Sequence, residues 1–327
     1  MALRIAVIGL GLVGSSIGLA LKKKGTGLPR RGGTDAERLE IVGHDKDHEA
    51  AKRAHKGGCV DRTEWNLISA CDGADLVVIS TPLAGIKSTL MAIAGELKEG
   101  CVVTDTAGLK VPVLNWARES LPATVHFVGG HPIVRRGQAD AAEPAADLFA
   151  EAVYCLTPAT NAPPAALQRV SDLAETIGAR PYYMDAAEHD GLIAVVEQVP
   201  LLMGLALLDV ASSSPSHREI ARLSSAAFSR VIEPLTGDAR KLGEVCGVNG
   251  ANVARWLDSL LSRLSTLRES VANQDSASLQ EVFARALEAR VAWARGESEG
   301  GETDYSDFSM TRMMMGDMFR PRPDQKK

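Results

Sequence analysis

Short apolar runs alternate with segments of helical periodicity over the first 185 residues of the chain. The runs are rich in β-branched residues, and polar or glycine-containing stretches separate them. Strands are predicted at residues 5–8, 41–44, 74–80, 101–105, 125–128, 153–156 and 181–184. Strands that alternate with helices are typical of a doubly wound, mostly parallel sheet with helices on both faces. The expected fold class of residues 1–185 is therefore α/β.

Residues 186–295 carry helical patterns only, and helices are predicted at residues 192–211, 220–232, 253–271 and 279–294. The segment 192–210 is interrupted only by Glu197, Gln198, Pro200 and Asp209. It is more apolar than one exposed helix should be, so we expect it in a domain core or a subunit interface. Residues 296–327 are rich in glycine and acid and then in methionine, and we expect them to be largely disordered.

The segment Gly9-Leu10-Gly11-Leu12-Val13-Gly14 joins the first predicted strand to a helical pattern. Gly9 permits a tight turn, Gly11 lets backbone N–H groups approach a phosphate, and Gly14 lets the helix pack closely on the sheet. A pyrophosphate is then held at the positive N-terminus of the helix. This strand, turn and helix predict a Rossmann-type dinucleotide site.

Asp45 ends the second apolar run, where such folds place a carboxylate that accepts the ribose hydroxyls. It lies further along than the usual spacing of about 20 residues. Residues 26–40 have the composition of a loop insertion, and without them the spacing is normal. An acid at this position favours NAD over NADP, although Lys46 and the Arg30-Arg31 pair act against that preference.

The composition excludes several classes of protein. The 327 residues are 45% hydrophobic, enough for two domains, and the net charge of −5 argues against nucleic acid as a partner. The five cysteines are scattered and form no CxxC pair, so neither a disulfide framework nor a metal site is expected. Apart from residues 5–21, which contain four glycines and a serine pair, we expect no stretch that could span a membrane. A cytoplasmic protein is therefore predicted.

Ligands of open parallel sheets bind at the carboxyl ends of the strands. The candidates there are Ser80-Thr81-Pro82, Thr104-Asp105-Thr106, Gly129-Gly130-His131-Pro132 and Arg135-Arg136. We expect His131 to follow a Gly-Gly turn that exposes its imidazole to the cofactor cleft. Imidazole suits proton transfer from an alcohol near neutral pH, while a hydride leaves for nicotinamide.

Two other residues each allow two interpretations. His189 precedes Asp190 at the start of the long apolar segment, and either belongs to the helix start or faces the site. Arg230, among apolar neighbours, either pairs within its own domain or clamps a substrate carboxylate. The remaining histidines are assigned to surface or structural positions.

Taken in order, these segments resemble the prephenate dehydrogenase family, which includes arogenate dehydrogenases. The resemblance runs from Arg4 to about Leu267. It rests on the glycine segment, Asp45, Ser80-Thr81-Pro82, Val103-Thr104-Asp105 with Lys110, Gly129-Gly130-His131-Pro132, Leu156-Thr157-Pro158, Ala187-Glu188-His189-Asp190, Phe228-Ser229-Arg230-Val231 and Asn249-Gly250-Ala251-Asn252-Val253.

The resemblance implies a dinucleotide-binding domain, residues 1–185, followed by an all-helical dimerisation domain, residues 186–295. It also implies NAD-dependent oxidative decarboxylation, in which His131 receives the hydroxyl proton, ring carboxylate leaves as carbon dioxide and Arg230 holds a substrate carboxylate. The implied cofactor contacts are Gly9, Gly11, Leu12, Val13, Gly14, Asp45, Ser80, Thr81, Pro82 and Asp105.

The chain departs from the family pattern on the substrate side. Gly108 stands where a serine is usual, and Glu197-Gln198-Val199-Pro200-Leu201 replaces a Ser-His-Leu-Pro-His run. We expect Thr106 to supply the missing hydroxyl, and Gln198, Arg135 and Arg136 to supply substrate contacts. An added Glu197 suits the ammonium group of arogenate.

The sequence therefore predicts a homodimeric, NAD-dependent prephenate or arogenate dehydrogenase of tyrosine biosynthesis. One alternative is an NAD-binding dimer with weakened catalysis and a regulatory or interaction role. Another is a dehydrogenase of a different small hydroxy acid.

Overall fold

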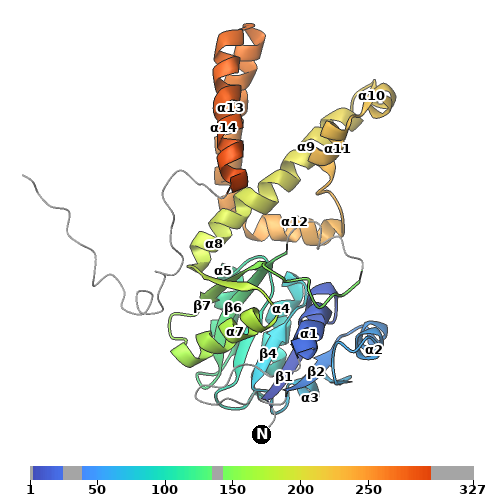
Figure 1. Ribbon diagram of the computed structural model, residues 1–327, viewed down its shortest axis with the longest axis vertical. Coiled ribbons are helices and arrows are strands. Elements are labelled where there is room, and N and C mark those ends of the chain that lie inside the picture. The colour runs from blue at the N-terminus through green and yellow to red at the C-terminus, as the bar shows by residue number, and fades with distance from the viewer. Residues whose placement is uncertain (1–2, 25–38, 135–142, 296–327) are drawn as a thin grey trace, which may run out of the picture. The chain divides into compact units, whose positions relative to one another are not determined.

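A computed structural model describes residues 3–24, 39–134 and 143–295 (Figure 1). The chain divides into two compact units, Met1–Leu257 and a second unit that begins at Asp258. The loop insertion, Arg135, Arg136 and the Met-rich tail lie wholly or mainly outside the described residues. The first unit contains the sheet and the helices that follow it directly.

The described residues of the first unit form one eight-stranded sheet in the order β3-β2-β1-β4-β5-β6-β7-β8. The strands are β1 (Leu3–Ile8), β2 (Leu39–His44), β3 (Arg62–Thr63), β4 (Leu76–Ile79), β5 (Val102–Asp105), β6 (His126–Ile133), β7 (Val153–Pro158) and β8 (Arg180–Tyr183). All pairs are parallel except β6 with β7. The chain order reverses between β1 and β4, which is where such sheets bind ligands. The α/β prediction is confirmed.

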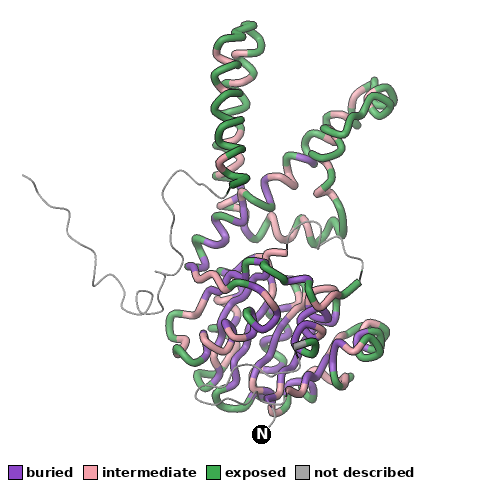
Figure 2. Tube along the Cα trace, viewed as in Figure 1, coloured by how far each residue is buried: buried purple, intermediate pink, exposed green. Residues whose placement is uncertain are grey.

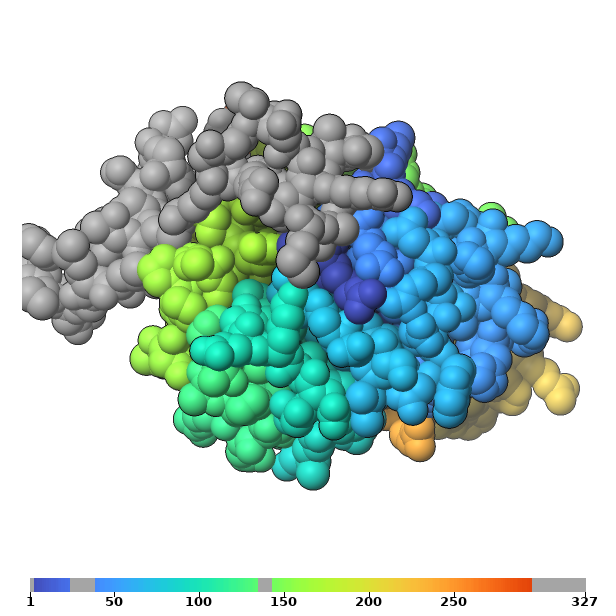
Figure 3. All heavy atoms as spheres, turned by 90° about the horizontal axis from the view of Figure 1, so that it is seen from below, coloured from blue at the N-terminus to red at the C-terminus, as the bar shows by residue number. Residues whose placement is uncertain are grey.

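Helices cover both faces of the sheet. They are α1 (Leu12–Lys24), α2 (His48–Lys56), α3 (Leu67–Cys71), α4 (Leu83–Ile93), α5 (Val111–Ser120) and α7 (Pro164–Thr176). Asp47 and Asn66 cap α2 and α3, because their side chains accept hydrogen bonds from the first free backbone N–H groups. Seen from the end where the N-terminus lies, blue to yellow-green residues form most of the coloured surface (Figure 3).

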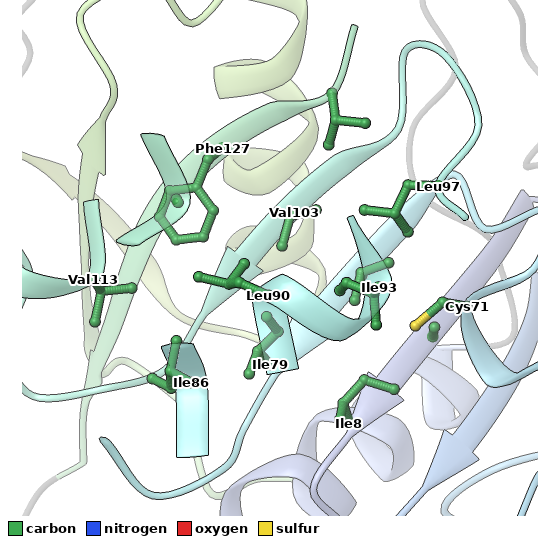
Figure 4. Close-up of a cluster of buried hydrophobic side chains, with 14 of the residues drawn as sticks. Ile8, Cys71, Ile79, Ile86, Leu90, Ile93, Leu97, Val103, Val113 and Phe127 are labelled. Atoms are coloured by element: carbon green, nitrogen blue, oxygen red, sulfur yellow. The ribbon is translucent and has the colours of Figure 1, made fainter. Parts of the chain in front are cut away.

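The main core lies between the sheet and α4 and α5. Ile79 and Val103 are fully buried in the sheet, and Ile86, Leu90 and Ile93 of α4 pack against them (Figure 4). Full burial of each such side chain stabilises the fold by about 1.5–3 kcal/mol. This packing holds the carboxyl ends of β4, β5 and β6 in fixed positions.

The end of β6 differs from our expectation. We predicted a Gly-Gly turn before His131, whereas the strand continues through both glycines to Ile133. A Cβ on Gly129 would overlap the Thr157 hydroxyl, and one on Gly130 would lie 2.6 Å from the Asp105 carbonyl oxygen. The glycines therefore allow close packing within the sheet rather than a turn.

The helical region follows the sheet without further strands among the described residues. Its elements are α8 (Ala186–Ile193), η1 (Ala194–Gln198), α9 (Val199–Ser212), α10 (His217–Leu223), α11 (Ala226–Ile232), α12 (Ala239–Val248), α13 (Gly250–Ala272) and α14 (Ser276–Arg295). The element η1 is one π-helical turn, in which the Val199 N–H donates to the carbonyl of Ala194. Pro200, the second residue of the following helix α9, has no N–H for the regular helical ladder. The single long helix that we predicted is therefore interrupted at this turn.

Our expectation about membrane spans was wrong for one segment. The 27 residues Ala186–Ser212 are long and apolar enough to cross a membrane, and 33% of their most apolar window is buried. Exposure concentrates on α9, where Leu205 is 51% and Val210 72% exposed (Figure 2). Length and composition alone do not separate a membrane span from a helix that packs against protein.

Candidate active site

The glycine segment forms an open cradle at the N-terminus of α1. Gly9 has φ +96°, and a Cβ there would overlap the Ser80 carbonyl oxygen. A Cβ on Gly14 would overlap the carbonyl oxygen of Gly9, so the helix lies directly on the turn. Gly11 is different, because a Cβ on it would meet nothing within 4 Å. The cradle thus leaves free space where backbone N–H groups can approach a phosphate.

Asp45 lies beside this cradle. Its Oδ2 accepts a 2.7 Å hydrogen bond from the Leu10 N–H, and its Oδ1 accepts one of 2.8 Å from the Asp47 N–H. These bonds fix the half-buried carboxylate at the end of β2, next to the glycine turn. The residues present therefore fit the adenosine half of a dinucleotide.

The ends of β4 and β5 meet on the other side of the turn. The Thr106 hydroxyl donates to Ser80 Oγ over 3.2 Å. Thr81 Oγ1 is buried without a hydrogen-bond partner among the described residues, and Pro82 is the N-cap of α4. The structure thus puts Thr106 beside the predicted cofactor residues and shows no contact between it and His131.

Asp105 is not accessible to a cofactor, contrary to its predicted role. Both Asp105 and Lys110 have side chains that are 0% exposed, and Lys110 Nζ donates to Asp105 Oδ2 over 2.5 Å. The carboxylate also accepts from the N–H groups of Ala107 and Gly130, while Lys110 Nζ donates to the Gly130 carbonyl. Buried charges persist only when they are paired and hydrogen-bonded in this way. Asp105 therefore ties β5 to β6 beneath the site.

His131 projects from β6 and is 8% exposed. Its Nδ1 lies 3.0 Å from His189 Nε2, and the two rings meet edge to face at 78°. His189 Nδ1 in turn lies 2.8 Å from Asp190 Oδ1. The three side chains form a buried chain of hydrogen bonds that ends at His131.

This chain of hydrogen bonds determines where the protons lie. The Asp190 carboxylate can only accept, so His189 donates from Nδ1 and presents a lone pair at Nε2. His131 then donates from Nδ1, and its own Nε2 carries a lone pair. His131 Nε2 is thus oriented as a proton acceptor.

The surroundings keep His131 neutral. Burial, then the neighbouring His189, then the cationic Lys110 lower the pKa of His131 well below its ordinary value of 6.5. The lone pair at Nε2 is therefore available at neutral pH.

Asp190 has a second function, which the sequence interpretation missed. Its two oxygens accept from the backbone N–H groups of Lys110 and Val111 over 2.7 and 2.9 Å, at the start of α5. Its carbonyl accepts from Asn249, just before α13. Asp190 thereby joins α8 to the sheet and to the later helices. The adjacent His-Asp pair was the only signal in the sequence.

Gly108 and Glu197 line the space in front of His131. A Cβ on Gly108 would lie 3.7 Å from His131 Nε2 and 3.9 Å from Glu197 Oε2. Glu197 as a residue is exposed, yet the surrounding protein desolvates its carboxyl group and raises the pKa of that group. The imidazole and the carboxylate therefore face the same space from β6 and η1.

Gln198 points away from this space. It is 3% exposed, its Oε1 accepts from Asn249 Nδ2 over 2.8 Å, and its Nε2 donates to the Val245 carbonyl over 3.4 Å. This geometry favours a structural role for Gln198 over the substrate contact that we predicted.

Arg230 is not brought to His131 within one chain. It is exposed on α11, which packs along the part of α9 remote from the sheet (Figure 1). The contact is close, since a Cβ on Gly204 of α9 would lie 2.6 Å from the Val231 carbonyl oxygen. Arg230 makes no hydrogen bond or ion pair with another described residue.

The fold and this site define a dinucleotide-binding α/β protein with a helical second region. A family model described as the nucleotide-binding domain of prephenate dehydrogenase matches residues 30–183. A second model, described as the prephenate dehydrogenase dimerization domain, matches residues 185–285. The chain belongs to the prephenate dehydrogenase family.

Curated relatives agree with this assignment. The chain is 30% identical over 295 residues to the probable prephenate dehydrogenase NovF of Streptomyces niveus, covering 86% of this chain and 73% of the relative. It is 27% identical over 290 residues to the cyclohexadienyl dehydrogenase of Zymomonas mobilis, covering 88% and 95%. Both alignments span most of each protein.

Solved structures share the fold. Prephenate dehydrogenase from A. aeolicus, in complex with hydroxyphenyl propionate and NAD+, has a TM-score of 0.78 at 21% identity and covers 89% of this chain and 98% of that one. Synechocystis arogenate dehydrogenase has a TM-score of 0.74 at 22% identity and covers 89% and 100%.

Proposed function

We propose that this chain is an NAD-dependent dehydrogenase that oxidatively decarboxylates prephenate or arogenate in tyrosine biosynthesis. The observation that carries the proposal is the hydrogen-bond chain from His131 Nδ1 through His189 to Asp190, which leaves His131 Nε2 as the proton acceptor beside Gly108. Membership of the family supports the reaction type.

The proposed cofactor contacts are the cradle and the strand ends beside it. They are Gly9, Gly11, Leu12, Val13, Gly14, Asp45, Ser80, Thr81 and Pro82. NAD held there would supply the acceptor for a hydride from the ring carbon that bears the hydroxyl. The carboxylate of Asp45 supports NAD over NADP, because it repels a 2′-phosphate.

His131 acts as the proton acceptor in this proposal. Its Nε2 takes the hydroxyl proton as the hydride leaves the same carbon. The bond from the ring to its carboxylate then breaks, carbon dioxide departs, and the electron pair of that bond makes the ring aromatic. This leaves a phenolate oxygen, which takes the proton back from His131. Burial of the imidazole excludes water from the proton transfer.

Cations are proposed for the substrate carboxylates. Arg230 is exposed and carries no ion pair with a described residue, which leaves its guanidinium free to bind an anion. Its distance from His131 within one chain requires an assembly in which α11 approaches a site. Arg135 and Arg136, outside the described residues, remain candidates for the same task.

We infer that the chain works as a homodimer through its helical region. The matching family domain is described as a dimerization domain. Of the described residues of α13 and α14, only Val253 is buried within one chain. A second copy would cover their apolar side chains. A reducing, cytoplasmic location is supported by five cysteines that are all free.

The test is an assay of the purified protein with prephenate and arogenate, each with NAD and NADP. Reduced cofactor and carbon dioxide should form in equal amounts with at least one substrate, faster with NAD than with NADP. If only another small hydroxy acid is turned over, the chain is a dehydrogenase of that acid rather than of prephenate or arogenate. NAD binding without turnover of any substrate would favour a regulatory dimer.

A further inference from the structure

The missing side chain at Gly108 creates a gap beside the proton acceptor. Gly108 is half-buried, and a Cβ there would make only ordinary contacts, at 3.7 Å to His131 Nε2, 3.8 Å to His131 Cε1 and 3.9 Å to Glu197 Oε2. No positive φ requires glycine at this position. The backbone therefore accepts a side chain, and in its absence the nearest polar group across the gap is a carboxylate.

The fold holds Glu197 in this position. It lies in the π-helical turn η1, between the buried Ala194 and Gln198. Gln198 anchors the turn through its hydrogen bonds to Asn249 and Val245. A π-helical turn shifts the direction of the side chains relative to a regular helix, and such turns are frequent at functional sites.

Three carboxylates lie near His131. Within the described part of the chain, Glu197 is the one of them whose carboxylate forms no hydrogen bond or ion pair with another residue. Asp105 is paired with Lys110, and Asp190 accepts from His189 and from two backbone N–H groups. The titratable and charged groups around the imidazole are Asp105, Lys110, Cys155, His189, Asp190 and Glu197. Glu197 is thus the carboxylate available to a new positive charge on His131.

The chemistry of the substrate is compatible with a carboxylate here. In prephenate and arogenate the ring carboxylate and the side chain share one carbon, and the hydroxyl lies on the carbon opposite. A group beside His131 therefore meets the hydroxyl end and avoids the negative end. This differs from our expectation that Glu197 would meet the ammonium group of arogenate, because that group lies on the side chain at the opposite end of the ring.

We propose that Glu197 is a second catalytic residue, whose carboxylate meets the substrate hydroxyl across the gap at Gly108 and stabilises the imidazolium formed when His131 Nε2 takes the hydroxyl proton. Glu197 takes up no proton in this step, and His131 returns the proton to the phenolate oxygen once the ring is aromatic. This proposal rests on the proposed function, because it assigns Glu197 a part in the same reaction.

The test compares Glu197→Gln with the wild-type protein. The exchange keeps the shape and removes the charge, so kcat should fall on the order of tenfold or more. The loss should be the same for prephenate and arogenate, with the KM for NAD unchanged. Because the carboxylate favours the imidazolium, the acid limb of the kcat profile should move to lower pH in the variant.

A restoring variant and a control complete the design. Gly108→Ser places a hydroxyl in the gap, so the double variant with Glu197→Gln should recover part of the lost kcat. Glu99→Gln, which makes the same exchange at an exposed carboxylate just before β5 and away from α9, should behave like the wild type. An unchanged kcat in Glu197→Gln, or an equal loss at every pH, would overturn the proposal.

A measurement without substrate separates this proposal from the proposed function. Titration of the His131 ring by nuclear magnetic resonance should give a lower pKa in Glu197→Gln than in the wild type. An unchanged pKa would overturn the pairing. An inactive wild type in which this pKa still moves would support the pairing and overturn the proposed function.

Discussion

At the scale of single residues, the site depends on how protons and charges are distributed behind His131. Its position after an apolar run allowed its role to be predicted from the sequence. The part of His189 was left open there, because its contact with His131 exists only once α8 has packed against the sheet. Asp105 was misjudged for the same reason: a carboxylate at a strand end is exposed or buried according to where Lys110 lies.

His189 should control the proton position on His131. In His189→Asn the chain of hydrogen bonds to Asp190 is lost and the other tautomer of His131 becomes accessible, so kcat should fall on the order of 100-fold. Steady-state kinetics would measure this loss, and the KM for NAD should not change. A variant with wild-type kcat would show that the tautomer is set in another way.

The pH dependence has a defined sign. Because the pKa of His131 is lowered, its neutral form persists below pH 6.5 and is lost only as the pH falls through the lowered pKa. In the wild type, kcat/KM should therefore be level at pH 6.5 and decline at lower pH. A midpoint of the acid limb above pH 6.5 would contradict this account of the imidazole.

The buried pair should govern stability. Lys110→Met leaves the carboxylate of Asp105 buried and unpaired, which should cost about 3–5 kcal/mol of the free energy of unfolding. Denaturant unfolding would measure it. The double variant Lys110→Met with Asp105→Asn should recover much of the lost free energy of unfolding. An equal loss in Lys110→Met and in the double variant would argue against a paired charge.

At the scale of elements, the apolar pattern predicted the parallel sheet well, since buried strands form continuous apolar runs. It failed at the end of β6, where Gly129 and Gly130 fit against the neighbouring Thr157 and Asp105 rather than forming a turn. It also missed η1, because one extra residue in a helical turn leaves little trace in hydrophobic periodicity. These details depend on tertiary packing.

The glycine cradle offers a matched pair of substitutions. Gly11→Ala meets no protein atom, so it should leave the melting temperature unchanged and weaken NAD binding about tenfold or more, because the new methyl group faces the phosphate. Gly14→Ala overlaps the backbone of Gly9 and should destabilise the protein itself, by about 1–3 kcal/mol. Calorimetry of NAD binding and thermal unfolding would separate the two. Equal affinity in Gly11→Ala would place the pyrophosphate elsewhere.

At the scale of the whole molecule, the proposed homodimer accounts for the apolar faces that a single chain leaves exposed in the helical region. The sequence indicated a core or an interface for residues 192–210, and a single chain leaves Leu205 and Val210 exposed on α9. A sequence cannot distinguish these cases, because an interface and a core have the same composition.

The proposed dimer can be disrupted on α9. The wild type should sediment as a dimer of 34.7 kDa chains, and Leu205→Glu with Val210→Glu should shift it toward the monomer, because charges would be buried at the interface. Analytical ultracentrifugation would measure the masses. Trp65→Glu serves as the control, because Trp65 is exposed and belongs to the nucleotide-binding part of the chain rather than to α9. A wild type that stays monomeric at high concentration would contradict the dimer.

The most direct test of the central claim is the rate of NADH formation by the wild type and by His131→Asn, with prephenate and with arogenate. We expect the wild type to form NADH and carbon dioxide in equal amounts, and the variant to lose about 100-fold or more of kcat while it still binds NAD. Undiminished turnover in His131→Asn would contradict the role of His131, and a wild type that binds NAD but forms no NADH would contradict the proposed reaction.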